Sequence, residues 1–280
     1  MDRFTASSKV IDSILLEMKK NNYIDPEAKF NYNSISNLRS EVTYRDSDFL
    51  SFLGYTELEE CFVDELTNYL VKKNVIDSKS TYNKNSFLEF RKEVKSSFSG
   101  TWTSISPVME RVIYMLTSIK QPKDILELGS FWGNTLAWFA GPCIGKSQQY
   151  QADSIIGVDI DKNMCEKAVI NFSKIANTEK LKIVNENALD YVSSLDTKID
   201  FLYLEAKTDE QTDLYLKLLK LIENKLSDNA WIIAHDIYDK DQMHDFDEYL
   251  EYVRNSENFK QSISLDVDSC GMELTIKGAK

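Results

Sequence analysis

Proline and glycine are scarce in this sequence of 280 residues, with four and nine copies, so it lacks linkers rich in these residues. It also lacks low-complexity tracts and repeats of a fixed period. Because 42% of the residues are apolar and 28% are charged, the chain can bury a sizeable core. These features exclude a disordered or fibrous chain and predict one large globular domain, or one domain with an appendage.

Cysteine is equally rare. The four cysteines, Cys61, Cys143, Cys165 and Cys270, are widely scattered and form no C-x-x-C pair. Zinc sites and disulfide frameworks use closer, paired spacings. We therefore expect four ordinary reduced thiols.

Basic residues are outnumbered by acidic ones, 33 to 45, which gives a formal net charge of −12. Such a surface repels phosphate backbones, so we expect no nucleic-acid partner. The longest apolar stretch, residues 125–140, contains Glu127 and Asn134 and is shorter than the ~20 residues that cross a bilayer. We expect no membrane span, and a start without the apolar core of a signal peptide predicts a cytoplasmic location.

The first hundred residues show helical periodicity. Apolar residues recur at helical spacing in residues 10–18, 56–73 and 86–97. We therefore predict a helical N-terminal extension over residues 1–97. Two roles stay open for its last segment, packing against the main domain or forming a lid or an oligomer interface over an active site.

Short β-type runs alternate with helices in the remainder, residues 98–280. The expected strands are 125–128, 155–158, 181–184, 201–204, 231–234, 259–266 and 272–276. Helices are expected from 106, after 133, after 161, and over 210–222 and 245–253. Apolar strands separated by helices predict an α/β fold, a doubly wound sheet of seven mostly parallel strands. A short turn at 269–271 makes the last strand antiparallel.

Five of the nine glycines lie between Gly129 and Gly157, at the first strand-to-helix turns, where ligands bind in doubly wound folds. The first turn has the spacing E-x-G-x-x-x-G, from Glu127 to Gly133. A dinucleotide site needs G-x-G-x-x-G, and Phe131 stands where its second glycine should be. The loop is better suited to a ligand that has an amino-acid end and a nucleoside end but no phosphate.

The strand ends resemble class I S-adenosylmethionine-dependent methyltransferases, particularly the small-molecule O-methyltransferases similar to the catechol and caffeoyl-coenzyme A enzymes. The resemblance covers about residues 98–277. Its motifs, in order, are DILELGSFWGNT, IIGVDID, ENALDYV, FLYLEAK and WIIAHD. It implies a Rossmann-like domain that binds S-adenosylmethionine and methylates an oxygen or nitrogen of a small molecule. Related enzymes with helical extensions often dimerise, so a homodimer through the N-terminal helices is a further expectation.

The resemblance also assigns cofactor contacts. Asp159 would accept hydrogen bonds from the ribose hydroxyls, and Asn187 would stand at the adenine edge. The full implied set is Glu127, Gly129, Ser130, Gly133, Asn134, Asp159, Ile160, Asn187, Ala188 and Glu205. Other roles stay open: the glycines could serve packing, Asp159 could cap a helix, and Trp132 and Trp138 could be core residues or contact the sulfonium.

Three residues are the candidate catalytic group: Glu205, His235 and Asp236, at the ends of the fourth and fifth strands. In metal-dependent relatives, two carboxylates and an amide at these positions hold a magnesium-like ion, which Glu205 and Asp236 would contact here. Histidine is a poor ligand for such a cation, so His235 argues against magnesium.

The lysine base of the relatives is also displaced, because Thr208 occupies its position and Lys207 stands one residue earlier. His235 and His244 are alternative bases. Acidic residues between 236 and 251 form a solvated helix face or attract a cationic substrate. Two rival functions remain: transfer or cyclisation of the aminocarboxypropyl group of the same cofactor, and an inactive scaffold.

Overall fold

The computed structural model describes residues 2–7, 13, 16, 20, 56–100, 105–206, 213–237, 246–267 and 270–278. The strands are β1 (Asp2–Phe4), β2 (Asp124–Leu128), β3 (Ser154–Asp159), β4 (Leu181–Asn185), β5 (Ile199–Leu204), β6 (Leu226–His235), β7 (Phe259–Leu265) and β8 (Met272–Lys277). The α-helices are α3 (Thr56–Lys72), α4 (Lys84–Ser97), α5 (Pro107–Lys120), α6 (Asn134–Ala140), α7 (Lys162–Phe172), α8 (Ala188–Ser194), α9 (Leu214–Ile222) and α10 (Asp247–Asn255). Short 3₁₀ turns follow α6 (Gly141–Cys143) and α9 (Glu223–Lys225).

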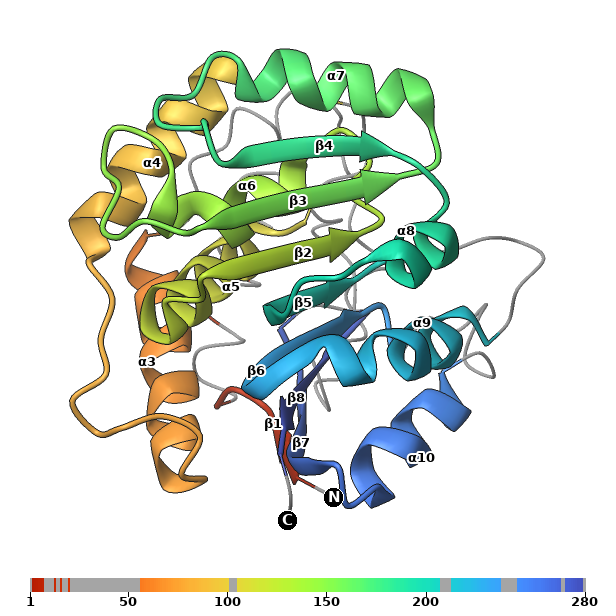
Figure 1. Cartoon of the computed structure of the whole chain (residues 1–280). Coiled ribbons are helices and arrows are strands. Elements are labelled where there is room, and N and C mark those ends of the chain that lie inside the picture. The colour runs from red at the N-terminus through yellow and green to blue at the C-terminus, as the bar shows by residue number, and fades with distance from the viewer. Residues whose placement is uncertain are drawn as a thin grey trace.

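The strands form one sheet in the order β1-β7-β8-β6-β5-β2-β3-β4 (Figure 1). All pairings are parallel except those of β8, which is antiparallel to both β6 and β7. The α/β fold and the antiparallel last strand are confirmed. The predicted count of seven strands was too low, because β1 adds an eighth strand at the edge beside β7. A segment of three residues carries too little alternation to reveal itself as a strand.

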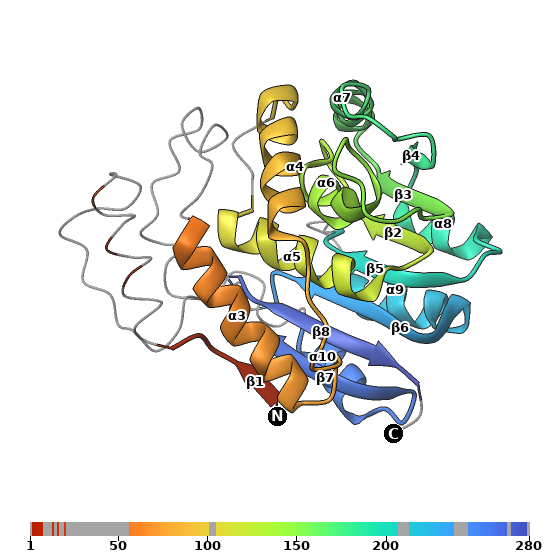
Figure 2. The same cartoon turned by 90° about the vertical axis from the view of Figure 1, so that its left-hand side faces the viewer.

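Helices cover both faces of the sheet, as the sequence predicts for a doubly wound fold. Alternate residues of β5 show the division: Phe201 and Tyr203 enter one apolar cluster with α4, α5 and α6, whereas Leu202 and Leu204 enter a second cluster with α8, α9 and α10. Figure 2 shows these helix groups on opposite sides of the sheet. Side chains that alternate between two covered faces explain why the strands are apolar throughout.

The described helices of the predicted extension pack against the sheet domain. Phe87 and Phe90 of α4 are fully buried and contact Tyr114 and Trp138 at ring-centroid distances of 5.1 to 6.2 Å. The helix at 86–97 and its apolar face are thus confirmed, and its packing role is observed. The predicted helix at 10–18 lies largely outside the described residues.

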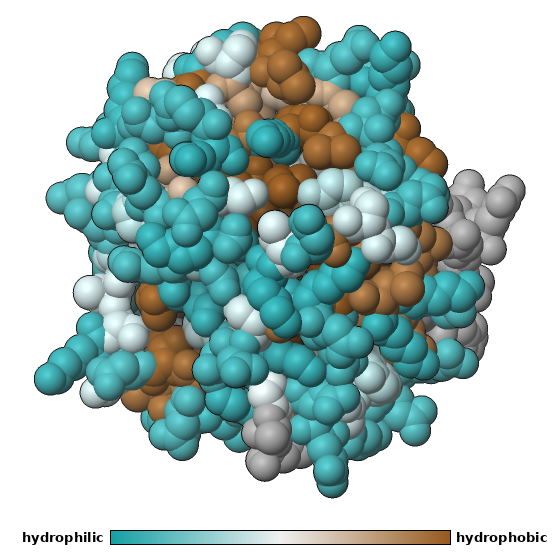
Figure 3. Space-filling model, in the orientation of Figure 1, coloured by the Kyte–Doolittle hydropathy of each residue, from teal (hydrophilic) through white to brown (hydrophobic). Residues whose placement is uncertain are grey.

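Helix α5 begins as its sequence predicts, with Pro107 in the first turn and the Ser106 side chain accepting a hydrogen bond from the Met109 amide. None of the described helices has the length and apolarity needed to cross a membrane. Figure 3 shows a largely hydrophilic surface with hydrophobic side chains at the top of the view, where α7 lies. Val169 and Ile170 of α7 are more than half exposed.

Candidate active site

The register of the sheet brings four strand ends to one edge. Leu128 of β2 pairs with Val158 of β3 and with Leu204 of β5, and Leu204 pairs in turn with Ala234 of β6. The residues that follow these positions are therefore neighbours at the carboxyl edge of the parallel strands, where ligands bind in open α/β sheets. The motifs found in the sequence thus meet in space.

The glycine loop after β2 requires both of its glycines. Gly129 has φ 95°, and a Cβ there would lie 2.6 Å from the Ala206 amide nitrogen. Gly133 has φ 86°, and a Cβ there would lie 2.7 Å from the Phe172 ring. Left-handed backbone and missing space together exclude other residues. The glycines let the loop pass close to β5 and let α6 pack against α7.

Asp159 connects the two loops at this edge. Its Oδ2 accepts a hydrogen bond from the Phe131 amide at 2.7 Å, and its Oδ1 accepts one from the Asp161 amide at 2.8 Å. The helix cap of α7 is Asp161 itself, so the alternative role of Asp159 as that cap is excluded. Each carboxylate oxygen offers two lone pairs, which leaves acceptor capacity for two further donors. Burial raises the pKa of Asp159, and the two amides oppose that rise.

Two large apolar side chains beside this carboxylate are exposed to solvent. Ile160, directly after Asp159, is 65% exposed, and Phe131 is 37% exposed. They are two of the few large hydrophobic side chains that the described residues expose. A carboxylate between exposed apolar groups suits a ligand that has both a flat apolar ring and hydroxyl groups.

Glu127 lies beneath the loop and is fully buried. Neither of its carboxyl oxygens has a hydrogen-bond partner within the described part of the chain. Burial, with smaller contributions from the charges of Glu205 and Asp159, raises its pKa well above the usual range. The buried Ser130 hydroxyl likewise lacks a hydrogen-bond partner there. The site therefore holds acceptor groups that a bound ligand can engage.

The remaining predicted cofactor residues lie at the N-termini of α8 and α6. Asn187 caps α8, its side-chain oxygen accepting a hydrogen bond from the Leu189 amide at 2.8 Å, and Ala188 is the first residue of that helix. Asn134 is the first residue of α6 and is buried. Trp138 is a core residue, and Trp132, 1% exposed, packs against Phe98.

The candidate catalytic residues Glu205, His235 and Asp236 form a cluster at the ends of β5 and β6. His235 Nδ1 lies 3.3 Å from Glu205 Oε1 and 3.5 Å from Asp236 Oδ1. Asp236 has φ 62°, a left-handed conformation at the point where β6 ends. The side chain of Glu205 is 25% exposed, against 5% for His235 and 11% for Asp236. Glu205 is therefore the member most open to a substrate.

Cys270 joins this cluster and Tyr215 lies near it, although no sequence motif pointed to either residue. Donor atoms of His235, Asp236 and Cys270 lie within 4.8 Å of one another. Tyr215 of α9 has a buried hydroxyl without a hydrogen-bond partner among the described residues. Burial, followed by the charges of Asp236 and Glu205, raises the pKa of this hydroxyl. Cys270 was detectable in principle, because an antiparallel last strand must start at the edge where its parallel neighbour ends.

The register of β8 confirms that reasoning. Met272 of β8 pairs with His235 of β6, so the turn before Met272 lies at the carboxyl edge. Three other candidates, Lys207, Thr208 and His244, lie outside the described residues, as does most of the acidic segment between 236 and 247.

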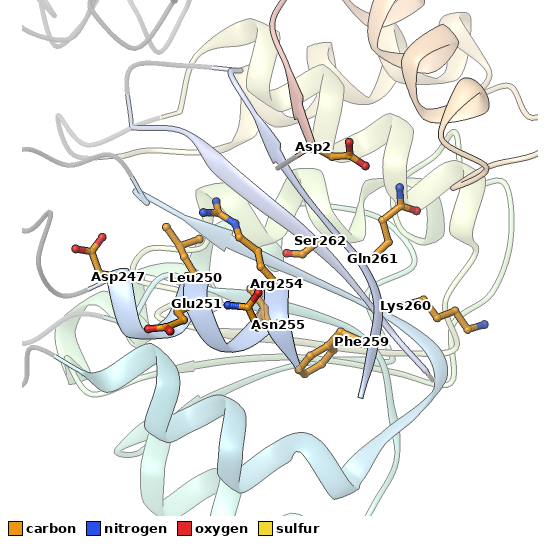
Figure 4. A pocket seen from close by; sticks show the side chains of 11 residues that line it. Asp2, Asp247, Leu250, Glu251, Arg254, Asn255, Phe259, Lys260, Gln261 and Ser262 are labelled. Carbon is orange, nitrogen blue, oxygen red and sulfur yellow. The ribbon is translucent and has the colours of Figure 1, made fainter. Parts of the chain in front are cut away.

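A separate cavity of about 680 Å³ lies away from this cluster. Figure 4 shows its lining side chains, which come from α10, the start of β7 and Asp2 of β1. It includes none of the strand-end residues described above. The candidate active site at the carboxyl edge of the sheet is therefore separate from this cavity.

Comparisons with known proteins agree with this arrangement. The S-adenosylhomocysteine-bound methyltransferase PaMTH1 of Podospora anserina matches with a TM-score of 0.56 and 16% identity, over 77% of this chain and 94% of that one. A Staphylococcus aureus protein described as a caffeoyl-CoA O-methyltransferase matches with a TM-score of 0.52 and 17% identity, over 76% and 99%. A Klebsiella pneumoniae protein described as an O-methyltransferase gives 0.54 and 14%, over 76% and 96%.

These structures share the fold with this chain at low identity. No curated protein matches the sequence. The model of a family described as O-methyltransferase matches residues 77–246, which is more than half of the chain. The chain therefore belongs to the O-methyltransferase family.

Proposed function

We propose that this protein transfers the methyl group of S-adenosylmethionine to an oxygen or nitrogen atom of a small molecule. The observation that carries the proposal is the Asp159 carboxylate, which two backbone amides hold in place beside the exposed Ile160. The family match favours methyl transfer over aminocarboxypropyl transfer and over an inactive scaffold. S-Adenosylmethionine-dependent methyl transfer is the chemistry that this edge of the sheet supports best.

The residues present fit the cofactor. Asp159 has acceptor capacity for the two ribose hydroxyls, and Ile160 offers an apolar surface to the adenine. The unpaired oxygens of the buried Glu127 suit the ammonium group of the amino-acid end. When bound, S-adenosylmethionine supplies an electrophilic methyl group on a sulfonium. The protein contributes mainly by holding donor and acceptor in line.

The acceptor must lose a proton, and we assign this to the Glu205–His235 pair. Glu205 is the most exposed of the cluster, and the imidazole nitrogen 3.3 Å from its Oε1 holds it in position. His235 and Asp236 are the buried support of that carboxylate. The donor set around His235 does not fit magnesium, which prefers an all-oxygen shell. We therefore assign the proton transfer to the protein side chains and not to a magnesium-bound group.

Calorimetric titration with S-adenosylhomocysteine tests the cofactor site. We expect micromolar binding that Asp159→Ala weakens at least about tenfold, because hydrogen bonds to a charged group contribute about 1.5–3 kcal/mol each. Asp190→Ala, an exposed carboxylate on α8, is the matched control and should bind normally. Absence of binding by the wild-type protein would contradict the proposal.

Product analysis separates the rival chemistries. With candidate phenols and amines as acceptors, S-adenosylhomocysteine should accumulate. Methylthioadenosine as the product would instead indicate transfer or cyclisation of the aminocarboxypropyl group.

Three broader expectations belong to the same proposal. We propose that residues 1–97 are the extension that completes the substrate pocket and supports a homodimer, and that the enzyme works in the cytoplasm. Leu16, within the segment expected to pair, is 55% exposed. Light scattering should give twice the mass of 32.3 kDa, and a monomer at micromolar concentration would contradict the dimer.

A further inference from the structure

Three donor types meet at the carboxyl edge of the sheet: an imidazole, a carboxylate and a thiol. His235, Asp236 and Cys270 are all buried, and their ligand atoms lie within 4.8 Å of one another. The three residues come from two separate segments, the end of β6 and the turn that leads into β8. Tertiary structure, not sequence proximity, assembles the set.

Left-handed backbone occurs at both segments that carry these donors. Asp236 has φ 62° and Gly271, next to Cys270, has φ 69°. Left-handed backbone is uncommon outside glycine, although aspartate adopts it more readily than most residues, and it is often found at functional sites. Because His235 pairs with Met272, both turns lie at the same edge of the sheet.

A second observation points to a bound species at this place. The Tyr215 hydroxyl is buried without a hydrogen-bond partner among the described residues, although Tyr215 is only 3% exposed. After burial, the charges of Asp236 and Glu205 are the largest influences on the pKa of this hydroxyl, so it lies in the neighbourhood of the cluster. Buried hydroxyls are nearly always hydrogen-bonded, and a ligand or a metal-bound water would satisfy this one.

We propose that His235, Asp236 and Cys270 bind a borderline-soft transition metal of the zinc type. Thiolate and imidazole ligands select Zn²⁺ and similar ions, whereas Mg²⁺ and Ca²⁺ prefer oxygen ligands. Three protein ligands leave a coordination position open, as in catalytic zinc sites. Glu205, whose Oε1 lies 3.3 Å from His235 Nδ1, supplies the outer carboxylate that orients such an imidazole.

Metal binding at this cluster does not depend on the proposed function. A role of the metal in catalysis does depend on it. A metal here would adjoin the place where the acceptor oxygen or nitrogen has to lie. The donor set therefore favours a different class of metal from the one that the magnesium-dependent relatives suggest, and it includes Cys270, for which no sequence motif predicts a role.

Cobalt titration of the chelator-treated full-length protein tests the site. We expect one equivalent of Co²⁺ to bind with a thiolate-to-cobalt charge-transfer band, and one equivalent of Zn²⁺ to displace it, while excess Mg²⁺ does not. Cys270→Ser should remove the band and weaken Zn²⁺ binding at least about 100-fold, since even outer-shell changes cost about 10–100-fold. The exposed Cys61 gives the matched control, Cys61→Ser, which should keep the band.

A Co²⁺ spectrum without the thiolate band, or a band that survives Cys270→Ser, would overturn the inference. Should that variant fail to fold, alkylation of the wild-type protein decides: Zn²⁺ should slow alkylation of Cys270 at least about tenfold while Cys61 reacts unchanged. Equal rates with and without Zn²⁺ would overturn it. S-Adenosylhomocysteine titration of the same metal-free sample separates the two proposals, because intact cofactor binding without a metal site would refute only the metal.

Discussion

At the scale of single residues, Glu127 is a position that lowers the stability of the fold and leaves a carboxyl group available to a ligand. The sequence predicts it as a cofactor contact from its place in the glycine motif. The structure adds that its carboxyl is fully buried with both oxygens unpaired, which no sequence pattern reveals. A buried polar group without partners costs stability, and such costs are found at functional sites.

Glu127→Gln should therefore stabilise the protein increasingly as pH rises. The raised pKa means that folded Glu127 keeps its proton while the unfolded chain ionises above a pKa of about 4.3. Stability from this group is thus complete below that pH and is lost as pH rises toward the folded pKa. Between the unfolded and the folded pKa, the difference in free energy of unfolding between the variant and the wild type should rise by about 1.4 kcal/mol per pH unit, in favour of the variant.

Urea unfolding at pH 5, 6 and 7 measures this difference. Glu166→Gln changes an exposed carboxylate on α7 and should show no comparable slope. The same Glu127→Gln protein should bind S-adenosylhomocysteine more weakly, because glutamine, unlike glutamate, cannot release a proton to pair with the ammonium group of the ligand. Parallel stability profiles for the wild type and Glu127→Gln would contradict the neutral buried state.

At the scale of elements, the sequence correctly predicted the strands and helices whose formation depends on local sequence pattern. The inner parallel strands β2, β3, β5 and β6 were found because apolar runs such as 201–204 are buried between the helices of both faces. Helix α5 was found from Ser106 and Pro107, whose roles are local. β1 and the place of Cys270 were missed, because they depend on pairing with β7 and on the register of β8.

Asn171 of α7 is a contact that only the structure shows. Its side chain is fully buried, accepts a hydrogen bond from the Ser99 amide at 3.0 Å, and donates to the Ser99 and Trp132 carbonyls at 3.2 and 3.1 Å. Trp132 belongs to the glycine loop, and its ring lies against Gly100. One amide thus connects the end of the α4 segment, the cofactor loop and α7.

Asn171→Ala should lower the free energy of unfolding by about 2–3 kcal/mol, because it removes three hydrogen bonds to the backbone, one of them to the buried Trp132 carbonyl. It should also weaken S-adenosylhomocysteine binding, since the glycine loop loses a support. Denaturant unfolding and calorimetry measure the two effects. Val169→Ala alters an exposed residue of the same helix and should leave both nearly unchanged. A lower free energy of unfolding with unaltered S-adenosylhomocysteine binding would show that Asn171 supports the fold but not the binding site.

At the scale of the whole molecule, one apolar core extends across the predicted boundary at residue 97. The cluster that contains Phe62 of α3 and Phe87 of α4 also contains Ile125 of β2 and Ile155 of β3. Composition and periodicity distinguished a helical part from an α/β part. They could not show whether the two parts unfold separately, because that depends on the packing between them.

Buried charges strengthen this connection. Arg91 of α4 is 1% exposed and pairs with Glu59 of α3 at 2.8 Å and with Glu110 of α5 at 3.2 Å. Its guanidinium also lies 4.3 Å from the centre of the Phe87 ring. Burial raises the pKa of Glu59, and the charge of Arg91 opposes that rise. Without Arg91, two buried carboxylates would lose a partner.

We therefore expect scanning calorimetry to give one cooperative transition for the full chain, with equal calorimetric and van't Hoff enthalpies. Arg91→Met should lower the free energy of unfolding by about 3–5 kcal/mol and shift the whole transition, because it breaks a buried ion pair. Within the described part of the chain, Glu59 would keep only Arg111, at 3.6 Å, and Glu110 only Lys95, at 2.6 Å. Lys162→Ala removes an exposed pair with Glu166 and should change stability by less than about 0.5 kcal/mol. Two transitions, of which Arg91→Met moves only one, would instead establish residues 1–97 as a domain of their own. A single shifted transition would mean that residues 1–97 cannot detach as a whole without unfolding the sheet domain. Any lid function of this segment would then require local opening at its edge.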